Sequence, residues 1–348
     1  MTDRYHRQRL LPDIGNAGQT RLGRSRALIV GCGALGCVSA DLLARAGVGT
    51  ITIVDRDLVE ETNLQRQTLF DESQVGAPKA AAAADRLAAV NSGVRTIPVV
   101  ADFAASNAER IAADDAGHAP DVILDGTDNF ETRFLINDLA VKLGVPYLYA
   151  GAVGTSGMLA SFLPPFGADA SPCLRCVFEG PPPAGSQPTC DTAGVMGPLV
   201  SVVASLQAGE AIKVLTGAHD SVRRTLLEID VWGNSVREVP LAGLLDPACP
   251  CCAARTFAYL DHAEAGPVAI CGRDAVQVTP GVRTRIDLDA VAEKLRSHGS
   301  FTTTRFLVRG LLDGESIELT VFRDGRALVG GTTDPARARS IYAKYIGA

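Results

Sequence analysis

The first half of the chain alternates short apolar runs with longer amphipathic segments. The apolar runs at 26–30, 50–54, 96–100, 121–125 and 146–150 predict buried strands. The segments at 38–46, 79–90 and 130–143 predict helices. Strands and helices that alternate in this way are typical of an open, mostly parallel sheet with helices on both faces. The sequence therefore predicts an α/β fold with a doubly wound sheet.

The pattern changes after residue 150. It predicts a strand at 157–163, an apolar helix at 198–215 and a hairpin at 224–239, with a proline-rich loop at 180–188. From about residue 255 a small α+β module is predicted, with a helix at 287–298, three strands and a last helix that starts at Asp334. We expect an N-terminal helical arm at 1–25, a main domain at 26–254 and a C-terminal module of unknown role at 255–348.

Composition narrows the class of protein. The 348 residues are 47% hydrophobic and 21% charged, which is ordinary for a folded globular chain, and the net charge of −6 argues against a nucleic-acid partner. We find no apolar run that approaches the roughly 18 residues of a membrane span and no secretion signal at the N-terminus. We therefore expect a cytoplasmic protein without a membrane partner. Its nine cysteines would be reduced there and would serve metal binding or catalysis rather than disulfides.

A glycine-rich loop, G-C-G-A-L-G at 31–36, links the first strand to the first helix. Such a loop directs backbone N–H groups toward a phosphate, and Asp55 at the end of the next strand is placed for ribose hydroxyls. By itself this motif indicates a nucleotide, NAD first of all. Three further residues favour nucleotidyl transfer instead: Arg66, Lys79 and Asp128. Negative charge builds on the phosphates as pyrophosphate departs, and it can be offset by the two cationic side chains and by a Mg²⁺ ion held by Asp128.

Five motifs together give a more specific resemblance: R-Y-H-R-Q, G-C-G-A-L-G, N-L-Q-R-Q, G-T-D-N and T-C-D-T-A-G-V-M-G-P-L. Between residues 4 and 254 the chain resembles the MoeB/ThiF (HesA) family of ubiquitin-activating-enzyme-like adenylyltransferases. The resemblance implies a Rossmann-like domain, an ATP site and a homodimer in which Arg7 reaches the triphosphate bound by the partner subunit. Our predicted nucleotide contacts are Gly31, Gly33, Ala34, Gly36, Asp55, Asp57, Thr62, Asn63, Leu64, Gln65, Arg66, Lys79, Asp128 and Asn129. Ala34 departs from the family, which often has a second glycine there; its methyl group is acceptable if the residue keeps a negative φ.

Two C-x-x-C pairs provide four thiolates, the number that a closed structural zinc site needs. They are Cys173 with Cys176 and Cys249 with Cys252, and the family keeps zinc ligands at these places. Cys251 could replace either of its neighbours, although with poorer loop geometry.

Cys190 is a candidate nucleophile because it follows the proline-rich loop and precedes the apolar helix. In ThiF-like relatives this position handles sulfur, whereas in MoeB-like members it is dispensable for adenylation. The resemblance therefore leaves a catalytic role for Cys190 open.

The resemblance implies ATP-dependent adenylation of the C-terminal glycine of a small ubiquitin-fold sulfur carrier that ends in Gly-Gly. Pyrophosphate would leave, and a sulfur donor protein would then act in molybdopterin, thiamine or related cofactor biosynthesis. Three alternatives stay open: a tRNA-modifying ATP-dependent dehydratase of the same fold, an NAD(P)-binding oxidoreductase, and an inactive half of a heterodimer.

Overall fold

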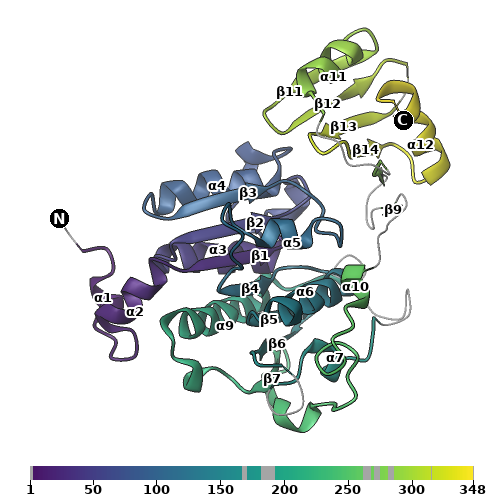
Figure 1. The fold of residues 1–348 in the computed structure, drawn as a ribbon. Coiled ribbons are helices and arrows are strands. Elements are labelled where there is room, and N and C mark those ends of the chain that lie inside the picture. The colour runs from purple at the N-terminus through teal and green to yellow at the C-terminus, as the bar shows by residue number, and fades with distance from the viewer. Residues whose placement is uncertain are drawn as a thin grey trace. The chain divides into compact units, whose positions relative to one another are not determined.

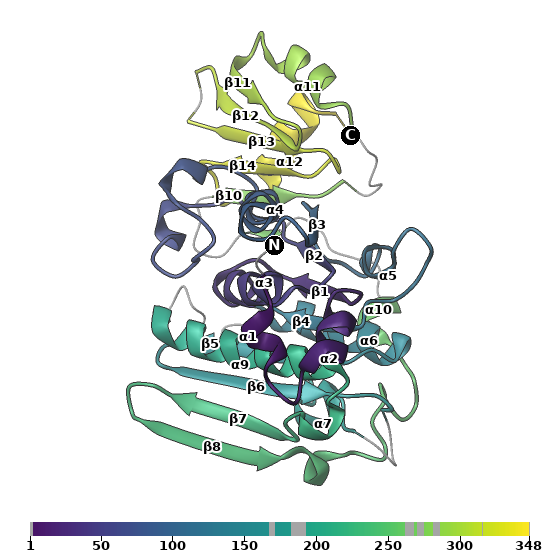
Figure 2. The ribbon, with the colours of Figure 1, turned by 90° about the vertical axis from the view of Figure 1, so that its left-hand side faces the viewer.

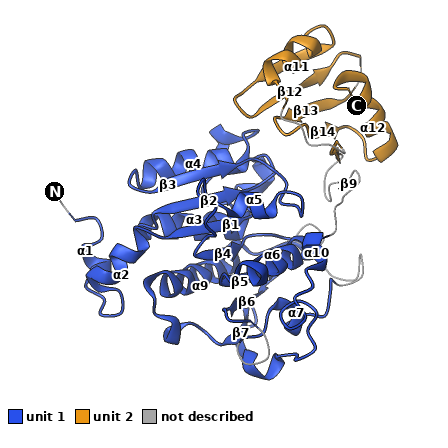
Figure 3. Ribbon diagram, viewed as in Figure 1, with its two compact units in different colours: residues 1–263 blue, residues 264–348 orange. Residues whose placement is uncertain are grey.

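The computed structural model describes residues 3–166, 171–181, 193–261, 268–269, 275–280, 286–314 and 316–347. The chain divides into two compact units, Met1–Ala263 and Glu264–Ala348 (Figure 3). Each unit has its own sheet and core, and the two are described separately below.

Unit 1 is built on an eight-stranded sheet in the order β3-β2-β1-β4-β5-β6-β7-β8 (Figure 1). The strands are β1 (Arg26–Val30), β2 (Thr50–Val54), β3 (Arg95–Val99), β4 (Val122–Asp125), β5 (Tyr147–Val153), β6 (Ser156–Phe162), β7 (Thr225–Asp230) and β8 (Ser235–Pro240). The five strands β3, β2, β1, β4 and β5 are parallel, and β6, β7 and β8 continue the sheet as an antiparallel meander. The expected α/β fold with a mostly parallel sheet is thereby confirmed.

Helices cover both faces of the parallel part (Figures 1 and 2). The α-helices in the described part of unit 1 are α1 (His6–Arg9), α2 (Gly15–Leu22), α3 (Ala34–Ala46), α4 (Lys79–Val90), α5 (Ala108–Ala112), α6 (Phe130–Leu143), α7 (Leu174–Val177), α9 (Gly197–Thr216) and α10 (Ala258–Asp261). Strand β1 shows why there are two layers: Ala27 and Ile29 pack with α3 and α9, whereas Leu28 and Val30 pack with α6. Successive side chains of a buried strand point to opposite faces of the sheet and so pack into two separate cores.

Helix α3 corrects one predicted boundary. We expected the helix to begin at Val38, but it begins at Ala34, inside the glycine-rich motif. Gly36 is therefore a helical residue and not part of the loop. A helix that starts so early brings its positive N-terminal end close to the end of β1.

Helix α9 corrects a second expectation. Its 20 residues are long and apolar enough to cross a membrane by length and composition, although we found no such run in the sequence. In the structure 61% of its apolar window is buried, and it packs along α3 and β5. Helix α9 is therefore placed as a core helix of unit 1.

Unit 2 is an antiparallel sheet of six strands in the order β11-β12-β13-β14-β10-β9. Its elements are β9 (Val268–Ala269), β10 (Ala275–Val278), α11 (Leu288–Leu295), β11 (Gly299–Thr303), β12 (Leu307–Leu312), β13 (Glu318–Phe322), β14 (Ala327–Gly330) and α12 (Pro335–Tyr345). Side chains of Asp287 and Asp334 cap the two helices, and both pack onto the apolar core of the sheet. The three predicted strands correspond to β12, β13 and β14; the sequence analysis missed β9, β10 and β11 and extended α11 three residues too far.

One buried glutamine ties three elements of unit 1 together. Gln207 of α9 donates hydrogen bonds to the carbonyl oxygens of Asp125 on β4 (2.9 Å) and Leu148 on β5 (2.8 Å). Its own side-chain oxygen accepts from the Ser39 hydroxyl on α3 (2.8 Å). A polar side chain inside an apolar helix is tolerated here because all its groups find partners.

We expect Gln207→Leu to lower the free energy of unfolding by about 2 kcal/mol or more, because it removes the hydrogen bonds from Gln207 to two buried carbonyl groups. The control Ser205→Ala, on the exposed side of the same helix, should change it by less than about 0.5 kcal/mol. Urea denaturation measures both. Equal stability of the two variants would contradict the role of the glutamine.

Candidate functional site

The candidate nucleotide site lies where the sheet changes direction. Strands β1 and β4 are parallel neighbours, but the chain leaves β1 toward β2 and leaves β4 toward β5 on the other side. The loops that follow them, 31–33 and 126–129, therefore diverge at the carboxyl ends of the strands. Open α/β sheets bind their ligands in the crevice at this point.

Glycines let the two loops meet. Gly31 has φ +89°, and a methyl group on it would lie 2.5 Å from the carbonyl oxygen of Gly126. A methyl group on Gly36 or on Gly126 would collide with the carbonyl group of Gly31. Gly33, by contrast, has open space around it, because a methyl group there would lie 3.8 Å from its nearest neighbouring atom. Three glycines are thus required by close backbone contact, and Gly33 is not.

Gly33 caps the N-terminus of α3, and Ala34 is the first residue of the helix. A helical residue has a negative φ, so the methyl group of Ala34 fits where the family often has glycine. The backbone of this turn remains available to a phosphate at the helix N-terminus.

Asp55 holds the glycine-rich loop from the neighbouring strand. One of its carboxylate oxygens accepts from the backbone N–H of Cys32 (2.6 Å), and the other accepts from the N–H of Asp57 (2.7 Å). Burial raises the pKa of Asp55, while the charge of Lys79 counteracts part of that rise. The carboxylate therefore lies at the base of the crevice, next to the loop it positions.

Lys79 and Asp57 lie beside this carboxylate. The Lys79 side chain is only 6% exposed, and its ammonium group lies 3.4 Å from the Asp57 carboxylate. Lys79 is the first residue of helix α4. Arg56 lies between the carboxylates of Asp57 (3.9 Å) and Asp102 (3.2 Å). Of the predicted nucleotide contacts, the structure therefore brings Asp55, Asp57 and Lys79 together. It also places Arg56 beside them, which the sequence analysis did not name.

The segment 62–66 follows as a short helical turn. Asn63 is buried, and its side-chain oxygen has no hydrogen-bond partner among the described residues, whereas Thr62 and Gln65 are exposed and Leu64 is half-buried. The Arg66 guanidinium donates to the carbonyl oxygen of Thr62 (3.1 Å). The N-terminus of α9 abuts this segment, because a methyl group on Gly197 would lie 3.3 Å from the Gln65 carbonyl oxygen.

The loop after β4 exposes one carboxylate. Asp128 and Asn129 are exposed, and the Asn129 side chain caps α6 by accepting from the N–H of Thr132 (2.9 Å). Behind the loop, Arg133 donates to the carbonyl oxygen of Thr127 (3.0 Å) and lies 3.5 Å from the buried carboxylate of Asp125. Asp128 is therefore held at the mouth of the crevice by a buried framework.

Arg7 does not share this site within one chain. It is exposed on α1, whose neighbours Arg4 and Gln8 bind the carbonyl oxygens of Val90 and Ala46, at the C-terminal ends of α4 and α3. The glycine-rich loop lies at the other end of α3, about 20 Å away for a helix of 13 residues. Cys190 and most of the proline-rich loop lie outside the described residues.

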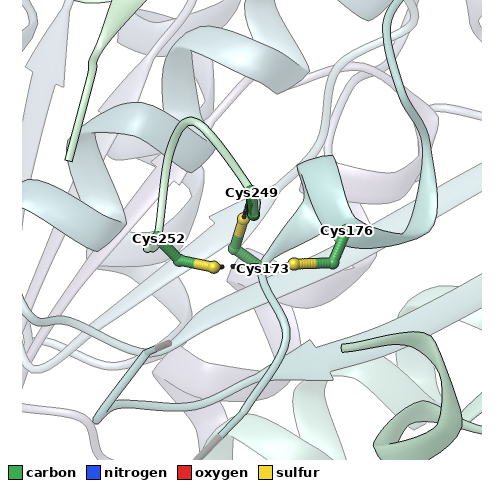
Figure 4. A group of neighbouring side chains, drawn as sticks. All are labelled: Cys173, Cys176, Cys249 and Cys252. Atoms are coloured by element: carbon green, nitrogen blue, oxygen red, sulfur yellow. Dashed lines mark hydrogen bonds between the residues drawn. The ribbon is translucent and has the colours of Figure 1, made fainter. Parts of the chain in front are cut away.

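Four cysteines form the second cluster (Figure 4). The sulfur atoms of Cys173, Cys176, Cys249 and Cys252 all lie within 4.8 Å of one another. The Cys173–Cys249 and Cys176–Cys252 distances are 3.7 and 3.5 Å. Four sulfurs at about 2.3 Å from a tetrahedral zinc ion lie about 3.8 Å apart, so the geometry is compatible with zinc.

The thiols of the cluster also shift one another's pKa values. Hydrogen bonds from neighbouring thiols lower the pKa of Cys173, and the hydrogen bond to Cys173 raises the pKa of Cys176 to about 12. A divalent metal would let such closely spaced thiolates coexist.

Cys251 lies beside this group and not in it. Its sulfur accepts a hydrogen bond from the Asn137 amide (3.3 Å), and its thiol also contacts Asp138 and Cys173. The group of sulfur atoms that lie within 4.8 Å of one another does not include it, so the geometry favours Cys249 and Cys252 over Cys251 as ligands.

Polar residues inside α6 escaped the sequence analysis. Arg133, Asn137 and Asp138 are buried, and every residue from Arg133 to Val141 is buried as well. The usable signal was the spacing of Arg133 and Asn137, which are four residues apart and so share one face of the helix.

The fold and these two clusters define a Rossmann-like nucleotide-binding protein with a four-cysteine centre. The chain belongs to the ThiF family, whose sequence model matches residues 5–251. This confirms the resemblance noted in the sequence.

Two relatives are similar over most or all of their length. The sulfur carrier protein ThiS adenylyltransferase of Bacillus subtilis (strain 168) is 42% identical over 351 aligned positions, which cover 100% of both chains. The sulfur carrier protein adenylyltransferase of Thermus thermophilus is 41% identical over 251 residues, 72% of this chain and 90% of the relative. Among solved structures, E. coli MccB with ATP shares the fold, with a TM-score of 0.61 and 21% identity over 72% of this chain and 74% of that one.

The glycine contacts lead to a prediction with a matched control. Gly31→Ala should lower the free energy of unfolding by about 2–3 kcal/mol, because the new side chain combines a positive φ with the clash against Gly126. Gly33→Ala should cost less than about 1 kcal/mol, since its backbone and surroundings accept a methyl group. Urea denaturation compares the two, and a larger loss for Gly33→Ala would contradict the predicted loop geometry.

Proposed function

We propose that this chain adenylates the C-terminal glycine of a small ubiquitin-fold sulfur-carrier protein and so prepares it for sulfur transfer in cofactor biosynthesis. The observation that carries the proposal is the whole-length similarity to a ThiS adenylyltransferase. The relative's name makes a carrier of the ThiS kind, with a Gly-Gly tail, the first candidate to test.

The reaction needs positioning and charge neutralisation rather than a general base. A C-terminal carboxylate is ionised at neutral pH, so it can attack the α-phosphate of ATP directly and form an acyl-adenylate while pyrophosphate leaves. The turn at Gly33 and Ala34 would hold phosphate oxygens, and the carboxylate of Asp55 would hold the ribose. Arg66 and Lys79 would offset the charge that develops on the phosphates.

Mg²⁺ is the cation we propose for the exposed carboxylate of Asp128, which offers the oxygen ligand that this ion prefers. When bound it would neutralise phosphate charge. Zinc is the ion we propose for the four cysteines, as a structural centre that takes no part in the reaction.

Arg7 would act across a homodimer. Its place at the far end of α3 leaves it remote from the site of its own chain, and the exposed helix α1 can present it to a second copy. We also propose a sulfur donor protein as a later partner, a required or auxiliary role for Cys190 in that step, and a cytoplasmic location.

ATP–pyrophosphate exchange in the presence of a purified carrier tests the function. Native protein should catalyse exchange, and Lys79→Ala and Asp128→Ala should each reduce it by about 100-fold or more, because each removes charge stabilisation from the reaction. The control is Arg95→Ala, which should leave the rate unchanged. Arg95 is exposed and lies at the N-terminal end of β3, whereas the proposed site lies at the C-terminal ends of the strands.

Absence of exchange with every carrier, together with no effect of Asp128→Ala, would contradict the proposal. NADH fluorescence that increases on binding would then favour the oxidoreductase alternative. ATP turnover with a tRNA substrate and no carrier would favour the dehydratase.

Subunit mixing tests the role of Arg7. Arg7→Ala and Lys79→Ala should each be inactive alone, because each leaves every site of the homodimer incomplete. Mixed dimers would contain one complete site, so co-refolded variants should recover about a quarter of the native activity. Recovery that fails although mixed dimers form would contradict a contribution from the partner subunit.

Metal analysis tests the cysteine centre. Purified chain should contain about one zinc per chain, and Cys252→Ser should lose it and unfold several degrees lower, because the loops lose their cross-link. Elemental analysis and thermal unfolding measure the two effects. Native protein stripped with a chelator should regain its melting temperature on addition of zinc, and a metal-free native chain of unchanged stability would contradict the assignment.

A further inference from the structure

Asn137 lies at the centre of helix α6 and is only 1% exposed. Its neighbours Ile136 and Leu139 are fully buried apolar residues. An amide in such surroundings costs about 1–3 kcal/mol unless its groups are satisfied. The contacts that satisfy it therefore show what holds the side chain in place.

Those contacts reach both cysteine loops. The Asn137 side-chain oxygen accepts from the backbone N–H of Leu174 (2.8 Å), which lies between Cys173 and Cys176. Its nitrogen donates to the sulfur of Cys251 (3.3 Å), which lies between Cys249 and Cys252. One planar amide thus sets the separation of two loops whose cysteines are 76 residues apart in the sequence.

The next residue strengthens the link to the second loop. Asp138 is fully buried, accepts from the backbone N–H of Tyr259 (2.8 Å), and contacts the thiol of Cys251. Both residues belong to the helix that begins at the nucleotide loop, and Arg133, one turn before Asn137, holds that loop at Thr127.

We propose that Asn137 is a positioning residue of the metal centre. It holds the two cysteine pairs at ligand distance from each other before and during metal binding, and it fixes the centre to helix α6. Partners of metal ligands orient the ligands in this way, and their loss typically costs 10–100-fold in metal affinity. The inference rests on the proposed occupancy of the centre by zinc.

The test measures how fast zinc leaves the full-length, zinc-loaded protein for a chromogenic chelator in excess. Asn137→Ala should release zinc about 10-fold faster or more than the native chain. The matched control is Asn91→Ala. Asn91 is 2% exposed and donates to the Ala44 carbonyl oxygen (2.7 Å) and to the Tyr5 hydroxyl (2.8 Å), outside the cluster. This control should lose stability but release zinc at the native rate.

Cys251→Ala removes the same hydrogen bond from its other end and leaves all four ligands in place. It should keep about one zinc per chain and release it at a rate between those of the native chain and Asn137→Ala. If Asn137→Ala cannot be obtained folded, this variant decides the question by itself.

Zinc release at the native rate in both variants would overturn the positioning role, and so would equal acceleration in Asn91→Ala and Asn137→Ala, which would indicate general loosening. Purified Cys251→Ala that contains no zinc would identify Cys251 as a ligand and would also overturn the positioning role of Asn137. A native chain without zinc would instead refute the proposed occupancy, so failure of the two proposals can be told apart.

Discussion

The close contact between Gly31 and Gly126 is the constraint on which the nucleotide end of unit 1 depends. It brings the ends of β1 and β4 so near that neither residue can carry a side chain. Because the loops meet there, the N-terminus of α3 and the exposed carboxylate of Asp128 open onto one crevice. Asp55 then fixes the glycine loop from β2, so three adjacent strands position the site.

Behind this contact, buried polar side chains hold the strand ends where backbone pairing stops. Gln207 bonds to carbonyl groups of β4 and β5, and Arg133 lies against Asp125 and binds the carbonyl oxygen of Thr127. Buried polar groups of this kind have specific partners, whereas apolar contacts tolerate sliding. The core of the site is therefore specified by a few hydrogen bonds within a largely apolar interior.

The parts of the molecule that depend on local sequence were predictable. The first strand, the glycine turn and Asp55 lie within one short stretch of the chain. The two C-x-x-C pairs predict a group of four thiolates from their spacing alone. The start of α3 was misjudged because Gly36 suggested a loop, whereas its real function is to let the helix pass the Gly31 carbonyl group. The roles of Gln207 and Asn137 were not predictable, because their partners come from segments distant in the sequence.

Helix α6 links the four-cysteine cluster to the loop that carries Asp128. The antiparallel strands follow β5 through a short turn to β6, then a long segment with α7 and α9 to β7, and every residue of the edge strand β8 is exposed. The loops around Cys173 and Cys249 bury their cysteines against Val141 of α6. A bound metal would cross-link these loops to each other, and Asn137 attaches them to the middle of α6, whose N-terminal end follows Asp128. The proposed structural ion would thus support the nucleotide site without touching it.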